Sequence, residues 1–180
     1  MSILKIARMG HPVLRAPARP LEPAEVTSAR IQKLIDDMVE TMQEYRGIGL
    51  AAPQVHECVR LFLAGIEHGD PEGDEEPELE FVPLINAEVT PVGRETVEDW
   101  EGCLSIPEMR GRVPRAREVK VRALDRRGKP IELRASDYPA RVIQHEADHV
   151  DGVLFLDRMT SFETLTYLEE YAKYWTKNKK

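Results

Sequence analysis

The sequence HEADH at residues 145–149 fits the pattern H-E-x-x-H and lies in a segment, 138–150, whose apolar residues recur at helical spacing. Two histidines four residues apart lie one above the other on a helix face, so both imidazoles can bind one metal ion. Glu146 lies between them, where its carboxylate can accept a proton from water at the metal. We therefore predict a helix over 138–150, with Asp137 as its N-cap, that carries a metal site. Two solvent-exposed histidines on a polar helix face are the alternative.

A catalytic metal site commonly takes three ligands from the protein and leaves one position open. Carboxylates apart, the other possible ligands are His11, His56, His68, Cys58 and Cys103. Cys103 is favoured because Gly102 precedes it, and a glycine lets the backbone approach a ligand closely. Spacing alone fits equally well with Cys103 as a small buried apolar residue. The three remaining histidines stand among prolines, charges or acidic residues, which indicates solvated side chains.

Patterns elsewhere in the chain predict helices near both ends and strands between them. The first 25 residues are rich in proline, which predicts an extended arm on the surface. Helical spacing over 31–42 predicts a helix capped by Thr27 or Ser28 and ended at Gly47, and a last helix is predicted over 161–175. Strands are predicted at 59–64, 81–89, 118–124 and 130–133, the last two joined as a hairpin.

This order of elements predicts an α+β fold rather than alternating βαβ units. A length of 180 residues, 42% of them hydrophobic, fits one compact domain over residues 1–180. We expect short, mostly antiparallel strands packed around the helix that carries H-E-x-x-H. The chain has no run of about 18 apolar residues and no secretory signal pattern at its start, so we expect a cytoplasmic protein with reduced cysteines.

The chain has 32 acidic and 25 basic residues, a formal net charge of -7, which argues against a protein whose main task is to bind nucleic-acid backbones. Eight of the carboxylates lie in residues 67–80, a segment without Lys or Arg, and the rest of the chain is close to neutral. We predict that this segment is an exposed loop that takes no part in the chemistry.

Three segments together resemble the signature motifs of the peptide deformylases: GIGLAAPQ at 47–54, EGCLS at 101–105 and QHEADH at 144–149. Their order and intervals are near those usual in that family. The resemblance extends through residues 10–15, 106–107, 113–115 and 151–155. It implies hydrolytic removal of the formyl group from the N-terminal formylmethionine of nascent proteins, with release of formate.

The resemblance also implies roles for individual residues. The implied ligands of one divalent metal, most often iron(II), are Cys103, His145 and His149; zinc, nickel and cobalt suit the same ligands. Glu146 would be the acid/base. The side chain of Gln54 and the backbone N–H of Leu104 would donate hydrogen bonds to the oxyanion.

Further residues are implied around the substrate and behind the ligands. Those along the substrate peptide and its methionine side chain are Ile48, Gly49, Gly102, Tyr138 and Val142. Arg115 would be the charge partner of Asp148, for which a solvated helix face is the alternative. Trp100 either borders the substrate groove or covers the core.

The chain departs from the family pattern at His56, where a glycine is usual, and over 138–143, where it resembles organellar and some bacterial members. A processed organellar form is therefore an alternative to a bacterial, cytoplasmic one. The last helix resembles one that some bacterial members use at the ribosome, although basic residues at 173–180 also suit a helix C-terminus.

Two rival functions use the same residues. One is a zinc peptidase that cleaves internal peptide bonds, and the other is a deformylase-like binding protein without activity. The expected partners are formylmethionyl nascent peptides, with neither a membrane nor a specific nucleic-acid sequence among them.

Overall fold

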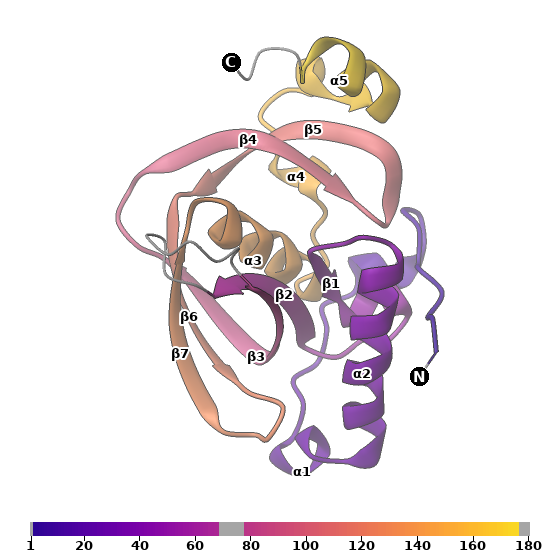
Figure 1. Cartoon of the computed structure of the whole chain (residues 1–180), viewed down its shortest axis with the longest axis vertical. Helices are drawn as coiled ribbons and strands as arrows, with labels where there is room; N and C mark the ends of the chain where they lie inside the picture. Colours follow the sequence, from indigo (N-terminus) through magenta and orange to yellow (C-terminus); the bar gives the residue numbers. More distant parts are fainter. Residues whose placement is uncertain (1, 69–77, 177–180) are drawn as a thin grey trace.

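The computed structural model describes residues 2–68 and 78–176, and these residues form two antiparallel sheets with a helix against both (Figure 1). One sheet consists, in this order, of β1 (Gly49–Ala51), β2 (Leu61–His68), β3 (Glu78–Pro91), β6 (Glu118–Leu124) and β7 (Pro130–Ser136). The other consists of β4 (Thr96–Cys103), β5 (Ile106–Ala116) and β8 (Thr166–Tyr167). The helices are α1 (Pro23–Val26), α2 (Ala29–Glu44), α3 (Asp137–Val150), α4 (Phe155–Arg158) and α5 (Leu168–Tyr174). The predicted α+β fold is confirmed.

The central element is α3, which contacts strands of both sheets. Its apolar side chains Ala140, Ile143 and Val150 are fully or almost fully buried. They pack in one cluster with Phe62 and Leu84 from the five-stranded sheet. Each large side chain buried in this way contributes about 1.5–3 kcal/mol, so packing fixes the helix that carries the histidines.

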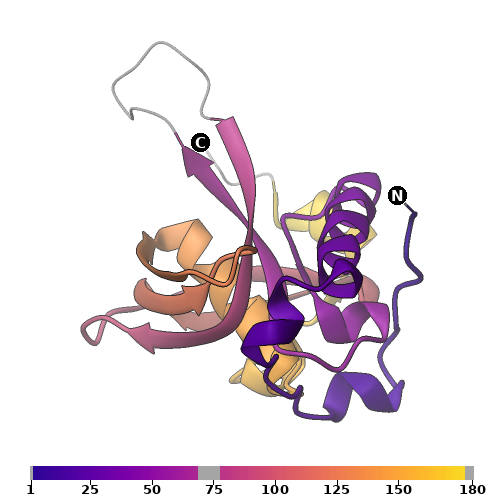
Figure 2. The ribbon, with the colours of Figure 1, turned by 90° about the horizontal axis from the view of Figure 1, so that it is seen from below.

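β2 shows how the five-stranded sheet is covered on both faces. Leu61 and Leu63 pack in the cluster that includes α2, whereas Phe62 and Ala64 pack in the cluster that includes α3. Successive side chains of a strand point to opposite faces of the sheet. Figure 2 accordingly shows α2 and α3 on opposite sides of the β2–β3 pair.

The predicted helix over 31–42 is confirmed as α2, with its ends set by neighbouring residues. The Ser28 side chain accepts a hydrogen bond from the backbone N–H of Ile31 at 3.4 Å, which makes Ser28 the N-cap. At the other end the helix stops at Glu44, and Arg46 has the left-handed conformation, with a φ of 53°. Gly47 then donates its N–H to the Met42 carbonyl at 2.8 Å, so the turn occurs one residue earlier than predicted.

α3 confirms the predicted helix over 138–150 but corrects its cap. Ser136 is the N-cap, and Asp137 has a φ of 54°. The Asp137 carboxylate accepts a hydrogen bond from Arg117 at 3.0 Å instead of capping the helix. The reason is that β7 runs directly into α3 without a loop, and a single left-handed residue makes the change of direction.

The prediction of one helix over 161–175 is wrong for its first half. Only Leu168–Tyr174 is helical, as α5; Phe162–Thr164 forms a 3-10 turn, and Thr166–Tyr167 forms β8. Thr166 and Tyr167 pair with Arg110 and Met109 of β5. This pairing with a distant strand interrupts a segment whose own spacing is helical.

Two predictions about surface segments need adjustment. The N-terminal arm is mostly extended, but it includes a 3-10 turn at Pro12–Arg15 and the short α1, which begins with a proline in its first turn. The predicted loop at 67–80 is shorter, because β2 continues to His68 and β3 begins at Glu78; residues 69–77 lie outside the described part.

Among the residues that the structure describes, no helix has the length and apolarity needed to cross a membrane.

Candidate metal centre

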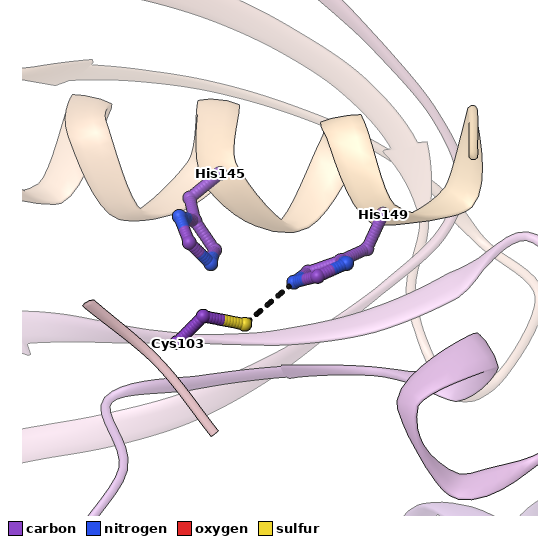
Figure 3. Close-up of side chains that lie close together, drawn as sticks. All are labelled: Cys103, His145 and His149. Atoms are coloured by element: carbon purple, nitrogen blue, oxygen red, sulfur yellow. Dashed lines mark hydrogen bonds between the residues drawn. The ribbon is translucent and has the colours of Figure 1, made fainter. Parts of the chain in front are cut away.

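Cys103, His145 and His149 come together where the end of β4 meets α3 (Figure 3). Their ligand atoms all lie within 4.8 Å of one another, and all three residues are buried. Cys103 Sγ is 3.2 Å from His149 Nε2, and the two imidazole rings have centroids 5.0 Å apart. The three side chains point toward one common position, as ligands of one ion must.

The electrostatics of this cluster favour the form of the Cys103 side chain that binds metal. Burial raises the pKa of Cys103, but the adjacent His149 and His145 outweigh it and hold that pKa well below its usual value. The thiolate is therefore favoured, and the thiolate is the form that binds metal. One thiolate and two imidazoles suit zinc, iron, cobalt or nickel.

His145 is oriented by a carboxylate that the sequence patterns did not identify. Its Nδ1 lies 2.9 Å from Glu101 Oε2, which leaves Nε2 as the nitrogen available to a metal. His149 Nδ1, in contrast, is buried without a hydrogen-bond partner among the residues described. Glu101 lies two residues before Cys103 in β4, so one strand supplies both a ligand and the group that orients another ligand.

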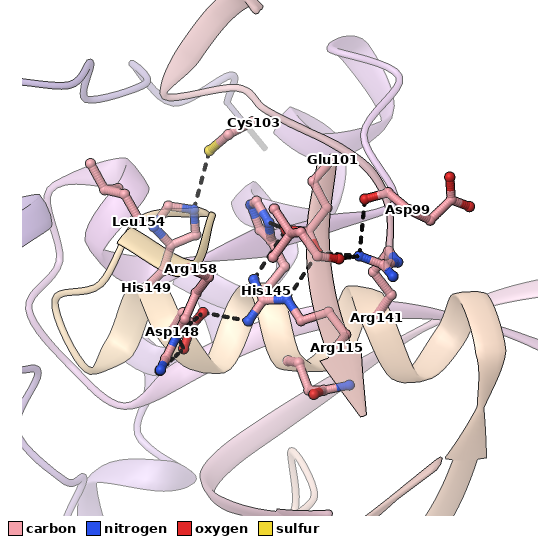
Figure 4. Close-up of polar contacts among 12 residues, drawn as sticks. Asp99, Glu101, Cys103, Arg115, Arg141, His145, Asp148, His149, Leu154 and Arg158 are labelled. Carbon is pink, nitrogen blue, oxygen red and sulfur yellow. Dashed lines mark hydrogen bonds and ion pairs between the residues drawn. The ribbon is translucent and has the colours of Figure 1, made fainter. Parts of the chain in front are cut away.

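Glu101 and Asp148 are buried carboxylates held by arginines, of which Arg115 is buried and Arg158 is exposed (Figure 4). Arg115 binds Glu101 through Nε and Nη2 at 2.9 and 3.0 Å, and through Nη1 it binds Asp148 at 2.6 Å. Arg158 donates to Asp148 from the other side, at 2.7 Å. Burial raises the pKa of Glu101, yet the bonds from His145 and Arg115 outweigh it and lower that pKa to about 2. Glu101 is therefore a permanent acceptor for His145.

Arg141 links α3 to the β4–β5 pair, and it too was not expected from the sequence. Its guanidinium donates to Glu101 at 2.9 Å and to the backbone carbonyls of Val97, Asp99 and Val113 at 2.6, 3.3 and 2.7 Å. Arg141 lies four residues before His145, on the same side of α3. The signal in the sequence was a charged residue that stands four positions before His145, between the apolar residues Ala140 and Val142.

Glu146 is buried beside the metal ligands, and its Oε2 makes no hydrogen bond within the described chain. It lies against Gly49 of β1, where a Cβ atom would overlap the carboxylate. Burial raises the pKa of Glu146 to about 7, against the opposing effect of His145 and His149. A carboxylate with such a pKa can accept and return a proton near neutral pH.

Gln54 points its amide into the same site from the 3-10 turn Ala52–Val55. Its Oε1 accepts the Ala51 N–H at 2.8 Å, which fixes the amide so that Nε2 faces Cys103 Sγ at 3.5 Å and Ser105 Oγ at 3.3 Å. Leu104, in the turn between β4 and β5, packs its side chain against the cluster around α2. Both residues line the cleft described next.

A cleft of about 1120 Å³ opens onto these groups and contains the predicted substrate residues. Those residues are Ile48, Gly49, Gly102, Tyr138 and Val142. Tyr138 is 53% exposed, whereas Val142 is buried, so the two form an outer and an inner part of one wall. Trp100 is half-buried and also lines the cleft. Of the two places expected for it, the border of the groove and the core, it therefore takes the first.

Of the remaining possible ligands, the three whose side chains are described lie elsewhere. His11 and His56 are exposed and contact each other, with ring centroids 4.7 Å apart. His56 has a φ of 67°, the left-handed region that a glycine would adopt more easily. Cys58 is a free thiol that lies 3.7 Å from the Pro17 carbonyl, and the side chain of His68 lies outside the described part.

Comparison with known proteins gives one consistent family. The family model described as "Polypeptide deformylase" matches residues 3–164. A protein of Nostoc sp. named peptide deformylase 2 is 41% identical over 178 residues, which cover 99% of this chain and 98% of that one. Peptide deformylase 2 of Pseudomonas putida is 41% identical, with 93% of each chain covered. The crystal structure of a Met-Ala-Ser-bound class I type b peptide deformylase from Acinetobacter baumannii superposes with a TM-score of 0.79 at 37% identity, covering 87% of this chain and 98% of that one.

Proposed function

Because this chain belongs to the polypeptide deformylase family, we propose that it removes the formyl group from the N-terminal formylmethionine of nascent peptides and releases formate. The observation that carries the proposal is one cleft lined by Cys103 and His145 of the Cys/His/His ligand set, by the buried carboxylate of Glu146 and by the amide donor of Gln54. The bacterial relatives favour action in the cytoplasm.

The three ligands fit one divalent metal, for which we propose iron(II), with zinc, nickel or cobalt as replacements. Donor chemistry supports the fit, since a thiolate and two imidazoles leave a position open for water or substrate. A metal in this position would supply the Lewis acidity that makes water nucleophilic near pH 7 and polarises a carbonyl oxygen.

Glu146 moves the proton in this reaction. Its Oε2, which has no hydrogen-bond partner among the described residues, accepts a proton from the attacking water as the water oxygen adds to the formyl carbon. Glu146 then gives the proton to the nitrogen of the departing peptide when the bond between carbon and nitrogen breaks. A pKa of about 7 suits both transfers.

The oxyanion that forms on the formyl group is bound by two donors of this chain, the Gln54 amide and the Leu104 backbone N–H. Support for Gln54 comes from its fixed orientation toward the site. Loss of one such donor commonly costs about 10²–10³ in rate.

The substrate peptide lies extended in the cleft between β1 and β4, which are edge strands of their sheets. Ile48 and Gly49 contact it on the β1 side, Gly102 lets its backbone come close on the β4 side, and Tyr138 and Val142 hold the methionine side chain. The relative from A. baumannii crystallised with Met-Ala-Ser supports a peptide in this position.

The C-terminal segment carries a separate proposal, docking on the ribosome. Lys173 and Tyr174 are exposed on α5, and Lys177, Lys179 and Lys180 follow outside the described residues. Basic side chains would bind RNA phosphates in a salt-dependent manner. Truncation after Phe162 should reduce co-sedimentation with ribosomes, and equal co-sedimentation of both chains would contradict docking.

The test of the main proposal is formate release from a formyl-Met peptide by the wild-type protein and by the Glu146→Ala variant. We expect formate from the wild type, an intact peptide product, and a loss of about 10²–10⁴ in the variant. Cleavage of an internal bond would indicate a peptidase instead. Binding of the peptide without formate release would indicate an inactive binding protein.

A further inference from the structure

The first described residues form an extended segment that contacts both α2 and the surroundings of Cys103. Leu4 and Ile6 pack against the cluster that includes α2, whereas Ala7 is buried in the cluster that includes Cys103. Figures 1 and 2 show the start of the chain beside α2. We call residues 2–9 the bracing segment, because its hydrogen bonds join elements that are far apart in the sequence.

Two N–H groups of the bracing segment hold the turns that carry the proposed oxyanion donors. Ala7 N–H donates to the Gln54 carbonyl at 2.7 Å, and Met9 N–H donates to the Ser105 carbonyl at 2.8 Å. In an extended chain, residues two apart point to the same side and lie about 6–7 Å apart. The spacing of Ala7 and Met9 therefore constrains the distance between the turn that holds Gln54 and the turn that holds Leu104.

α2 fixes the other end of the bracing segment through two buried polar side chains that the proposed reaction does not use. The Thr41 hydroxyl accepts the Leu4 N–H at 2.8 Å and donates to the backbone carbonyl of Asp37, one helical turn earlier, at 2.6 Å. The Asp37 carboxylate accepts the Ser2 N–H at 3.1 Å and the Ser2 hydroxyl at 3.2 Å. Thr41 is fully buried, and Asp37 is 5% exposed. The segment is thus attached to the helix three residues before Ala7.

We propose that Thr41, supported by Asp37, is a positioning residue for deformylation: by holding the bracing segment, it keeps Gln54 and Leu104 at the separation that the oxyanion requires. The inference rests on the proposed function, because it takes Gln54 and Leu104 as the oxyanion donors. It adds to the reaction two residues of α2 that do not line the cleft.

The other contacts between the two turns do not replace this restraint. The bond from Ala51 N–H to the Gln54 side chain, 2.8 Å long, joins residues only three apart, so it moves with its own turn. Gln54 Nε2 lies 3.3 Å from Ser105 Oγ, but the same Nε2 must also bind the oxyanion. A misplacement of about 1 Å can cost about 10² in rate, so the backbone bonds from residues 7 and 9 matter for the reaction.

The Thr41→Val variant tests the proposal, because valine has the shape of threonine but offers no hydroxyl to the Leu4 N–H. We expect kcat to fall about tenfold with KM nearly unchanged, since the oxyanion forms only after the substrate has bound. Metal content should stay the same. Thr41→Ser, which keeps the hydroxyl, should restore most of kcat.

The matched control is Thr164→Val, which removes the same kind of hydrogen bond at another place. Thr164 Oγ1 accepts the Arg112 N–H at 3.1 Å and joins the 3-10 turn Phe162–Thr164 to β5. Thr164 does not line the cleft. This variant should leave kcat unchanged, so an equal fall of kcat in both variants would mean that Thr41 has no special place in the reaction.

A double-mutant cycle separates positioning from a general loosening of the fold. If Thr41 acts through Gln54, removal of the Gln54 amide should remove most of the effect of Thr41. We expect Thr41→Val to lower kcat about tenfold in the wild-type background but less than about threefold in the Gln54→Ala background. The same loss in both backgrounds would overturn the proposal.

Amide hydrogen exchange measures the bracing segment without turnover. Exchange at Leu4, Ala7 and Met9 should be faster in Thr41→Val than in the wild type, because the segment opens more easily once its attachment to α2 is lost. Thr164→Val should exchange at these amides as the wild type does. Unchanged exchange at Ala7 and Met9 in Thr41→Val would contradict the bracing role.

The outcomes distinguish this proposal from the proposed function. No formate from a formyl-Met peptide in the wild type would overturn the function, and hydrogen exchange would still show whether Thr41 holds the segment. Formate release with the same kcat in the wild type and in Thr41→Val would overturn the positioning role alone. If Thr41→Val does not fold, Asp37→Asn takes its place in the cycle, and a kcat equal to that of the wild type would overturn the role of α2.

Discussion

Glu146 shows how a single residue is placed for chemistry at the expense of stability. Its carboxylate is buried, one oxygen has no hydrogen-bond partner in the described structure, and burial raises its pKa to about 7. A residue chosen for stability alone would not leave a buried acceptor unpaired, because such a group costs about 1–3 kcal/mol.

The Glu146→Gln variant should therefore be more stable and less active than the wild type. An amide of the same shape removes the buried charge, so we expect the free energy of unfolding to rise by about 1 kcal/mol. Without a group that accepts a proton, formate release should fall by about 10²–10⁴. Urea denaturation and the formate assay measure the two effects; a variant that is both less stable and fully active would contradict this account of Glu146.

Arg141 acts at the same scale by holding α3 to the strands that carry Glu101 and Cys103. Arg141→Met leaves three backbone carbonyls without this donor, that of Val113 buried and those of Val97 and Asp99 partly buried, and it removes one of the two arginines at Glu101. We expect a loss of about 3–5 kcal/mol of stability, and metal affinity about tenfold weaker because His145 is less well oriented.

The matched control for Arg141→Met is Arg134→Met. Arg134 pairs with Glu118 on the surface, with its side chain 66% exposed, and should change stability by less than about 1 kcal/mol. Thermal unfolding and metal titration of the two variants compare them directly. Equal effects would mean that the Arg141 network does not position the ligands.

At the scale of elements, β1 and α3 approach so closely at the site that only glycine fits at position 49. A Cβ at Gly49 would overlap the Glu146 carboxylate. Gly49→Ala should thus displace Glu146 and reduce formate release by at least about 100-fold. Metal content should be unchanged, since the three atoms nearest to the added Cβ all belong to Glu146 and not to a metal ligand. Metal analysis beside the activity assay checks both parts; loss of metal together with activity would point to a general collapse instead.

The elements that sequence could predict are those whose pattern is local. α2 and α3 repeat apolar residues at helical spacing, and β6 and β7 are joined by a turn sequence. β4 and β5 were not predicted, because β4 has four exposed residues at its start and β5 includes Pro107, Gly111 and Pro114. Their pairing with each other, and β8 with β5, depends on contacts that no local pattern encodes.

At the scale of the whole molecule, the site joins the two sheets. Cys103 comes from the three-stranded sheet, while α3, the helix that carries both histidines, packs against the five-stranded sheet. A metal bound by all three ligands would connect these parts. We expect removal of the metal with a chelator to lower Tm by several degrees and its return to restore Tm, because a ligand that binds only the folded state stabilises it.

The Cys103→Ala variant is the control for that experiment. It should melt at the same temperature with and without chelator, whereas Glu146→Ala should show the wild-type shift. A chelator shift of the same size in Cys103→Ala would place the stabilising metal elsewhere in the chain.

The site could be predicted from sequence where spacing determines geometry. His145 and His149 are related by one helix, so their common face follows from their spacing. Cys103 and Gln54 reach the same place through the fold. The sequence favoured Cys103 through its neighbour Gly102 and then through a family resemblance, whereas Gln54 was indicated by the resemblance alone. Glu101 and Arg141 were missed because their partners are far away in the sequence. Glu101 lies in β4, whereas Arg141 and His145, which bind it, lie about 40 residues later in α3.

The central claim is that one metal, held by Cys103, His145 and His149, is required for deformylation. It is tested most directly by adding iron(II) to metal-free protein without oxygen and measuring formate release from a formyl-Met peptide at each ratio of metal to chain. The rate should rise linearly and level off at one metal per chain, and Cys103→Ala should show no such rise. Full formate release by the metal-free protein, or the same titration curve from Cys103→Ala, would contradict the claim.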